Sequence, residues 1–248
     1  MLNNSTIWIG LPAFNEEKAI KKVLHSIYSL KTQIKNLKVV ILNDGSKDKT
    51  LENAKKFKKE LNISIVNNKK NRGLGNALYS LMLFFKKKSI SNDRLVLMDC
   101  DNTHDPGQII TMLKKAGNED GHIVIASRFQ RGSTVKNVPF LRNLLSLTAF
   151  IIFNIFFSTK GVRDFTSGYR LYDKKTIDKF FQVTGKSYIP SAGFEMQLEI
   201  LLKLRKSSIN FYEIPIILDY KKKPTGSKMN VIKTIINYLK LIILRIFN

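Results

Sequence analysis

Two aspartates one residue apart, Asp99 and Asp101, directly follow the apolar run Leu95–Met98. A strand points residues i and i+2 to the same face, so both carboxylates can face the crevice at the carboxyl end of an open α/β sheet. Two carboxylates together with a substrate diphosphate suit a hard divalent cation. Taken alone, the same residues fit equally well an aspartate-rich turn that caps a helix starting near Pro106.

Three earlier loops carry polar or glycine residues where predicted strands end. The first, Leu11–Glu17, places an acidic pair at the positive end of a helix, although a well-capped helix explains it as well. The second, Leu42–Thr50, puts Asp44 at a strand end, where a carboxylate can bind a nucleobase or a ribose. The third, Asn71–Ala77, has a Gly-x-Gly turn without the rest of a dinucleotide fingerprint, which favours a sugar or phosphate ligand.

Short apolar runs alternate with helical patterns over the first 130 residues. Strands are expected over 7–11, 38–42, 63–66, 95–98 and 123–126, and helices over 16–30, 49–60, 75–88 and 106–116. This alternation predicts a mainly parallel α/β sheet that is covered by helices on both faces.

Two apolar segments characterise the second half of the chain. Residues 143–159 carry no charge but fall short of the roughly 20 residues that span a bilayer, so a buried or interfacial helix is favoured. Residues 229–248 show the pattern of an amphipathic helix, which would lie on an anionic membrane surface or pack on the domain. We expect one catalytic domain over 1–228, with halves at about 1–130 and 131–228, followed by a C-terminal helix over 229–248.

Composition narrows the classes of protein and of partner. The chain has 248 residues, 44% of them hydrophobic, and a formal net charge of +23. Such a charge suits nucleic acid, but the basic residues are mostly lysines spread over many predicted helices, and no aromatic-basic RNA-binding motif is present. An anionic membrane or a phosphate-bearing substrate is therefore favoured, with no nucleic acid as partner. The single cysteine, Cys100, excludes a disulfide framework, and the opening residues suggest no secretion leader, so a cytoplasmic location is expected.

The four loops together resemble, in order and spacing, the catalytic domain of the family 2 glycosyltransferases, which are inverting GT-A enzymes. The shared motifs are Pro-Ala-Phe-Asn-Glu-Glu at 12–17, Asn-Asp-Gly-Ser-x-Asp-x-Thr at 43–50, Arg-Gly-x-Gly-x-Ala at 72–77 and Asp-x-Asp at 99–101. Segments 126–129, 141–146, 163–170, 193–195 and 227–229 are similar to the polyprenyl-phosphate, dolichyl-phosphate mannosyltransferase-like branch. The resemblance implies a GT-A type, Rossmann-like, mainly parallel sheet flanked by helices, with interfacial helices at the C-terminal end.

The resemblance also implies roles for single residues. The nucleotide and donor would be held by Pro12, Phe14, Glu16, Asp44, Gly45, Gly73 and Asp99. Asp99 and Asp101 would bind Mg²⁺ or Mn²⁺ and, with Arg128, would be the catalytic residues. The acceptor phosphate would be bound by Arg128, Arg142, Ser146 and Lys223. The chain departs from the family at Thr103, where relatives often have a glutamine ligand, and at Lys223, where an arginine would offer a bidentate fork.

The implied reaction is transfer of a hexose from a nucleotide sugar, of the GDP-mannose or UDP-glucose type, to a polyprenyl or dolichyl phosphate. The enzyme would be bound peripherally at the inner, cytoplasmic face of the cell membrane. A lipid phosphate is already an anionic nucleophile, so no strong base is needed and His104 is interpreted as a loop residue.

Two other hypotheses remain. A saccharide hydroxyl acceptor, in cell-envelope polysaccharide synthesis, would need a carboxylate base such as Asp164. Asp164 and Glu195 could instead orient the arginines, meet the sugar or form buried ion pairs. A non-catalytic basic protein that binds membrane or nucleic acid is disfavoured because both metal aspartates are retained.

Overall fold

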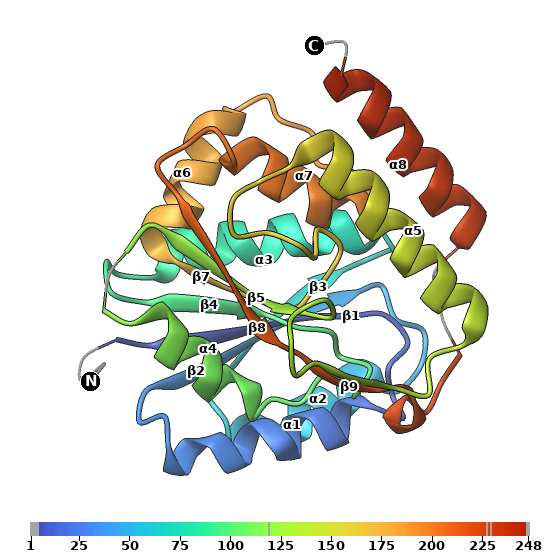
Figure 1. Ribbon diagram of the computed structural model, residues 1–248. Coiled ribbons are helices and arrows are strands. Elements are labelled where there is room, and N and C mark those ends of the chain that lie inside the picture. Colours follow the sequence, from blue (N-terminus) through green and yellow to red (C-terminus); the bar gives the residue numbers. More distant parts are fainter. Residues whose placement is uncertain (1–4, 119, 227, 229, 247–248) are drawn as a thin grey trace.

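A seven-stranded sheet forms the centre of the computed structural model, which describes residues 5–118, 120–226, 228 and 230–246 (Figure 1). The strand order is β3-β2-β1-β4-β7-β5-β8. The strands are β1 (Ile7–Ala13), β2 (Leu37–Asp44), β3 (Ile63–Asn68), β4 (Arg94–Leu97), β5 (His122–Ser127), β7 (Arg170–Asp173) and β8 (Asn210–Pro215). Only β7 is antiparallel, to β4 on one side and β5 on the other, so the predicted mainly parallel sheet is confirmed.

Helices cover both faces of the sheet (Figure 1). One face carries α1 (Ile20–Tyr28), α2 (Thr50–Lys56) and α4 (Gln108–Ala116), and the other carries α3 (Leu74–Lys88), α6 (Lys174–Thr184) and α7 (Glu195–Leu204). Strand β1 shows why apolar and polar residues do not alternate along the strands. Ile9 and Leu11 are buried under α1, whereas Trp8 is buried on the opposite face, under α3. A strand with apolar residues on both faces is stable only where both faces are covered.

The five strands and four helices expected in the first half are all present, with shifted ends. Helix α1 begins at Ile20 instead of residue 16 because residues 17–19 form a turn, in which the backbone N–H groups of Ala19 and Ile20 both donate to the carbonyl oxygen of Glu16. The backbone N–H of Glu16 donates to the hydroxyl of Thr50, 2.7 Å away. That bond ties the chain to the second loop before the helix can start. Helix α2 ends at Lys56 and continues as the 3₁₀ turn η2, Phe57–Lys59.

The second half adds elements that lie beside the sheet. Strands β6 (Thr134–Lys136) and β9 (Ile217–Asp219) form a separate parallel pair, and a second 3₁₀ turn, η1 (Ser29–Thr32), follows α1. The turn η3 (Tyr220–Lys222) leads from β9 towards the last helix. The uncharged segment forms α5 (Phe140–Phe157) and the amphipathic segment forms α8 (Val231–Ile246). Of the predicted C-terminal segment, residues 229 and 247–248 lie outside the described residues.

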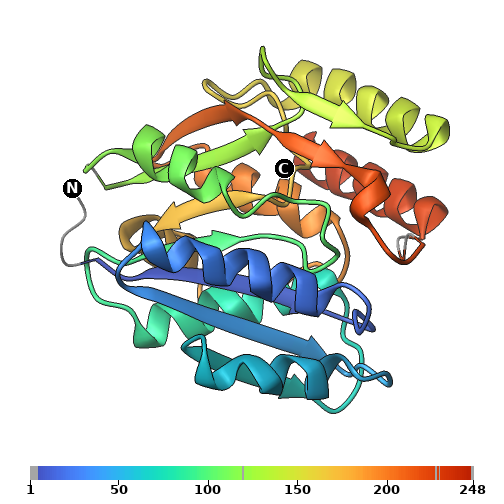
Figure 2. The same cartoon turned by 90° about the horizontal axis from the view of Figure 1, so that it is seen from below.

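Helices α5 and α8 lie side by side at the outside of the molecule (Figure 2). They contact each other through Phe153 and Tyr238, whose rings meet edge to face with centroids 5.1 Å apart. Across the described residues, no helix has the length and apolarity that crossing a membrane would need. Helix α5, which contains most of the uncharged segment, has Phe153 and Phe157 turned inward and Ile151 and Ile155 exposed.

Candidate active site

The loops that carry the sequence motifs meet at one edge of the sheet. Strands β1, β2 and β4 are parallel neighbours, so their carboxyl ends and following loops lie together. These loops line a cavity of about 500 Å³, which we call the strand-end cavity. Of the residues expected to bind the donor, it is lined by Pro12, Phe14, Glu16, Asp44, Gly73 and Asp99, and it is also lined by the expected metal ligand Asp101. Gly45 does not line it; at a φ of 71°, it makes the turn after β2.

The first two loops hold each other in place. The backbone N–H of Asn15 donates to the hydroxyl of Ser46 at 2.9 Å, and the N–H of Lys47 donates to Oδ1 of Asn15 at 2.9 Å. Asn15 has a φ of 53°, a left-handed conformation that asparagine tolerates better than most residues. The wall formed by these loops is therefore built by the protein before any ligand arrives.

Asp44 has a structural task that its position in the sequence did not reveal. Its carboxylate accepts backbone N–H bonds from Arg72 at 3.0 Å and Gly73 at 2.9 Å, and a bond from the side-chain amide of Asn68 at 2.8 Å. It thus holds the third loop against the end of β2. Gly73 has a φ of 90°, and a Cβ there would lie 2.3 Å from the carbonyl oxygen of Ala192, so the close approach requires glycine.

Asp101 is fixed from both sides. Its Oδ1 accepts the backbone N–H of Thr103 at 3.0 Å and the Thr103 hydroxyl at 2.6 Å. Its Oδ2 receives the ammonium of Lys223 at 2.7 Å. Thr103, the residue that departs from the family pattern, therefore orients Asp101 through its hydroxyl.

Asp99 is positioned through His104. The backbone N–H of Asp99 donates to Nδ1 of His104 at 3.1 Å, so in the neutral ring the proton lies on Nε2, which is 4.0 Å from Oδ2 of Asp99. The imidazole stacks on Tyr169 with centroids 4.9 Å apart. His104 thus belongs to the loop, as expected from the sequence, and it also supports the metal-site candidate Asp99.

The pKa values of Asp99 and Asp101 are shifted in opposite directions. Burial raises the pKa of Asp99 above its ordinary value, and the neighbouring Asp101 adds to the rise while His104 opposes it. Burial would also raise the pKa of Asp101, but the Lys223 ammonium and the Thr103 hydroxyl outweigh it and lower that pKa. A cation between the two groups would favour the charged form of both.

The residues fit a divalent cation as the sequence suggested. Asp99 and Asp101 supply hard oxygen ligands, and a lysine ammonium already sits on one of those oxygens as a stand-in cation. No cluster of three or more histidine, cysteine or acidic side chains that could hold a metal occurs among the described residues. The remaining ligands would therefore come from a bound substrate and water, as is usual for Mg²⁺ at phosphate sites.

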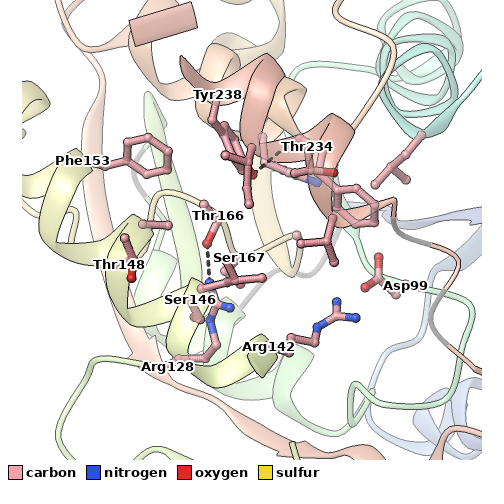
Figure 3. Close-up of a pocket in the computed structure, with 18 of the residues that line it drawn as sticks. Asp99, Arg128, Arg142, Ser146, Thr148, Phe153, Thr166, Ser167, Thr234 and Tyr238 are labelled. Carbon is pink, nitrogen blue, oxygen red and sulfur yellow. Dashed lines mark hydrogen bonds between the residues drawn. The ribbon is translucent and has the colours of Figure 1, made fainter. Parts of the chain in front are cut away.

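A second cavity of about 250 Å³, the helix cavity, opens between α5 and α8 (Figure 3). Apolar side chains from both helices line most of it, among them Leu145, Ile152, Phe153, Tyr238 and Leu239. Its polar end carries Arg128, Arg142 and Ser146, three of the four residues expected to bind an acceptor phosphate. The helix cavity shares six lining residues with the strand-end cavity: Leu74, Asp99, Asp101, Arg142, Phe194 and Thr234.

Arg128 is held by a buried carboxylate. Its Nε and Nη2 donate to the two oxygens of Asp164 at 2.8 and 2.6 Å, and its backbone N–H donates to the same group at 3.0 Å. Nη2 also bonds to the hydroxyl of Thr166 at 2.5 Å. Arg128 lowers the pKa of Asp164 against the effect of burial, and Asp164 is 1% exposed. A carboxylate so engaged is a positioning group for the arginine and is poorly suited to accept a proton from a substrate.

Lys223, the fourth residue expected at the acceptor phosphate, lines the strand-end cavity and pairs with Asp101. Sequence reasoning singled out Lys228 only as part of a motif, yet its ammonium bonds to the carbonyl oxygens of Phe14 and Asn15 and to Glu16. Glu195 also lines this cavity: its Oε1 accepts from Gly193 and Asn237, while its buried Oε2 has no partner among the described residues.

Comparison with known proteins places this geometry in a family. The family model described as "Glycosyl transferase family 2" matches residues 8–181. The dolichol-phosphate mannosyltransferase of Pyrococcus furiosus is 28% identical over 93% of this chain, which spans 60% of the length of that relative. The UDP-N-acetylglucosamine–dolichyl-phosphate N-acetylglucosaminyltransferase of Methanococcus voltae is 26% identical. That match covers 91% of this chain and 90% of the Methanococcus protein.

Solved structures share the fold at lower identity. Glucosyl-3-phosphoglycerate synthase from Mycobacterium tuberculosis, in complex with Mn²⁺, UDP-glucose and phosphoglyceric acid, superposes with a TM-score of 0.62 at 18% identity. The match covers 94% of this chain and 75% of that one. The fold class inferred from the sequence is thereby confirmed.

Proposed function

The chain belongs to glycosyl transferase family 2, and on that premise we propose that it transfers a hexose from a nucleotide sugar to the phosphate of a polyprenyl lipid. One observation carries the proposal: a strand-end cavity lined by many charged side chains and a mostly apolar helix cavity meet at Asp99, Asp101 and Arg142. A charged donor suits the first and an amphiphilic acceptor suits the second. Relatives named for dolichol-phosphate and polyprenol-phosphate glycosyl transfer agree with that pairing.

The donor would occupy the strand-end cavity. The nucleoside would lie against the interlocked first and second loops, near Phe14 and Glu16. The diphosphate would then reach Asp99 and Asp101, where a bound Mg²⁺ or Mn²⁺ would neutralise the charge that develops on the leaving nucleotide.

The acceptor phosphate would bind at the polar end of the helix cavity. Arg128 and Arg142 supply guanidinium groups that can bind phosphate oxygens, and Ser146 supplies a hydroxyl. Arg128 is held in place by Asp164, so its direction is set before binding. An oxygen of the acceptor phosphate would attack the anomeric carbon as the bond to the donor diphosphate breaks, with inversion at that carbon. The lipid chain would leave between α5 and α8.

A membrane surface would then be the natural partner of α5 and α8. Apolar side chains of both helices are exposed, including Phe140, Leu144, Ile151, Ile155, Ile232, Ile236 and Ile243. Exposed lysines flank them at Lys136, Lys160, Lys233 and Lys240. Exposed apolar side chains with lysines around them suit a protein that binds peripherally to the inner face of an anionic membrane.

A saccharide hydroxyl is the second candidate acceptor and needs a general base. Asp164 is a poor base because both of its oxygens accept hydrogen bonds and its pKa is lowered. Glu195 is the better candidate, since it lines the strand-end cavity with one buried oxygen unpartnered. Glu195→Gln would abolish transfer to a hydroxyl and leave transfer to a phosphate largely intact.

The test is a screen of GDP-mannose, UDP-glucose and UDP-N-acetylglucosamine against undecaprenyl and dolichyl phosphate in detergent, with products identified by mass. We expect one glycosylated phospholipid and one nucleoside diphosphate. The variant Ser146→Ala changes a residue that lines only the helix cavity, so it should raise the KM for the lipid phosphate while leaving donor binding unchanged. Glycosylation of saccharides without any lipid product would overturn the lipid-phosphate assignment.

A further inference from the structure

Two lysines from one segment reach the acidic residues of the strand-end cavity. The segment comprises residues 220–226 and 228 between β9 and α8, and we call it the lysine strap. Lys223 pairs with Asp101, and Lys228 pairs with Glu16. Both lysines line the cavity in which the donor would bind.

Lys228 is the fixed end of the lysine strap. Its ammonium donates to the carbonyl oxygens of Phe14 at 2.7 Å and Asn15 at 2.6 Å, and to Oε1 of Glu16. Three acceptors use all three N–H bonds of an ammonium. Two of the acceptors are backbone atoms of the first loop, so the strap stays attached whatever charge enters the cavity.

Lys223 is the exchangeable end. Its ammonium makes a single hydrogen bond with the described residues, to Oδ2 of Asp101 at 2.7 Å. The other oxygen of Asp101 is occupied by Thr103, so Oδ2 is the atom left for a cation. Both side chains are largely buried, at 13% and 12% exposure, so the pair is little screened by water.

We propose that Lys223 is a displaceable internal cation, which occupies Oδ2 of Asp101 until a divalent metal arrives and then turns to the phosphates of the donor. The proposal rests on the proposed function, because it assumes a metal–diphosphate donor at Asp99 and Asp101. A divalent ion binds a carboxylate oxygen at about 2.1 Å and would lie within a few ångströms of the ammonium, so the two cations repel. The metal and Lys223 therefore compete for Oδ2.

Without nucleotide, the metal can bind only while Oδ2 of Asp101 is open. The apparent affinity for metal is therefore the intrinsic affinity multiplied by the fraction of time that Oδ2 is open. If Lys223 holds the oxygen for about nine-tenths of the time, the apparent affinity for metal falls about tenfold. Lysine suits this role because it is a compact point charge on a flexible stem. An arginine would bind the carboxylate with two hydrogen bonds and would be harder to displace. The strength of the Lys223–Asp101 pair then sets how readily the site opens.

The experiment measures Mn²⁺ binding to the full chain without nucleotide or lipid, by the electron paramagnetic resonance signal of free Mn²⁺. Lys223→Met keeps the apolar stem and removes the charge, and we expect it to bind Mn²⁺ about tenfold more tightly than the wild type. Lys223→Arg keeps a cation on Asp101 and should bind Mn²⁺ no more tightly than the wild type. The control is Lys222→Met, which removes an equal charge from an exposed neighbour and should change the affinity less than twofold.

Two results would overturn the proposal. Equal affinities for Lys223→Met and Lys222→Met would mean that Lys223 does not compete for the site. A gain in Lys223→Met that survives the added change Asp101→Asn would mean that the metal binds elsewhere. Neither result depends on transfer activity, so a failed lipid acceptor screen would leave this inference intact, and a successful screen would not rescue it.

Discussion

The pairing of Arg128 with Asp164 supplies a quantitative test of how the acceptor arginine is held. Arg128→Met removes two side-chain hydrogen bonds, at 2.8 and 2.6 Å, from a carboxylate that is fully buried. Removing one partner of a buried ion pair costs about 3–5 kcal/mol. Asp164 keeps donors from the backbone of Arg128, Thr166 and Ser167, so we expect the lower end, about 3 kcal/mol.

The assay is a double-mutant cycle in urea with Arg128→Met, Asp164→Asn and the double variant. The single tryptophan, Trp8, is buried in β1 and reports unfolding by fluorescence. We expect the losses of unfolding free energy in the two single variants to sum to about 2 kcal/mol more than the loss in the double variant. In the double variant, the second change removes a group whose partner is already gone, so it costs less. A coupling energy below about 0.5 kcal/mol would refute the view that this pair fixes the arginine.

The same pair predicts the sign of a pH effect. The pKa of Asp164 is lowered in the folded protein, so ionisation stabilises the fold above the ordinary pKa of an aspartate, about 3.9. This stability is lost as the pH falls through the lowered pKa of the folded state. The difference in unfolding free energy between wild type and Asp164→Asn should therefore be constant near neutral pH and shrink in acid below about pH 4.

Three further changes test the metal, the third loop and the membrane face. Asp101→Ala, or chelation of divalent ions, should lower the transfer rate at least about a hundredfold because charge on the leaving group is no longer neutralised, and full activity in both would exclude a metal role. Gly75→Ala would place a Cβ 1.7 Å from the carbonyl oxygen of Ser191, so the KM for the donor should rise. Gly226→Ala meets no atom of the described residues within 4 Å and should not change that KM. Ile155→Asp puts a charge at a position that is 71% exposed on α5, so flotation with anionic vesicles should fall while the melting temperature is unchanged; unaltered flotation would move the membrane face elsewhere.

The first half of the chain could be predicted well because its signals are local. Each apolar run is long enough to define a strand, and each loop carries its motif within a few residues of the strand end. Element ends were predicted less well. The turn before α1 is tied to the second loop by a bond between Glu16 and Thr50, which are 34 positions apart, and no local pattern reports such a contact.

The second half was harder to predict because its order in space differs from its order in sequence. Strand β7 has only four residues and enters the sheet antiparallel between β4 and β5. Its burial comes from those neighbours, and a short strand with arginine and aspartate at its ends gives little periodic signal.

By itself, the sequence determined the α/β class, the family and the adjacency of Asp99 and Asp101, because strand periodicity and motif order are properties of neighbouring residues. Only the tertiary structure decided which charges face each other. It paired Lys223 with Asp101, 122 positions away, and Asp164 with Arg128. It also joined a cavity lined by charged side chains to a mostly apolar one. Electrostatic pairing acts over a few ångströms in space, whatever the separation along the chain, so the fold alone fixes the partners.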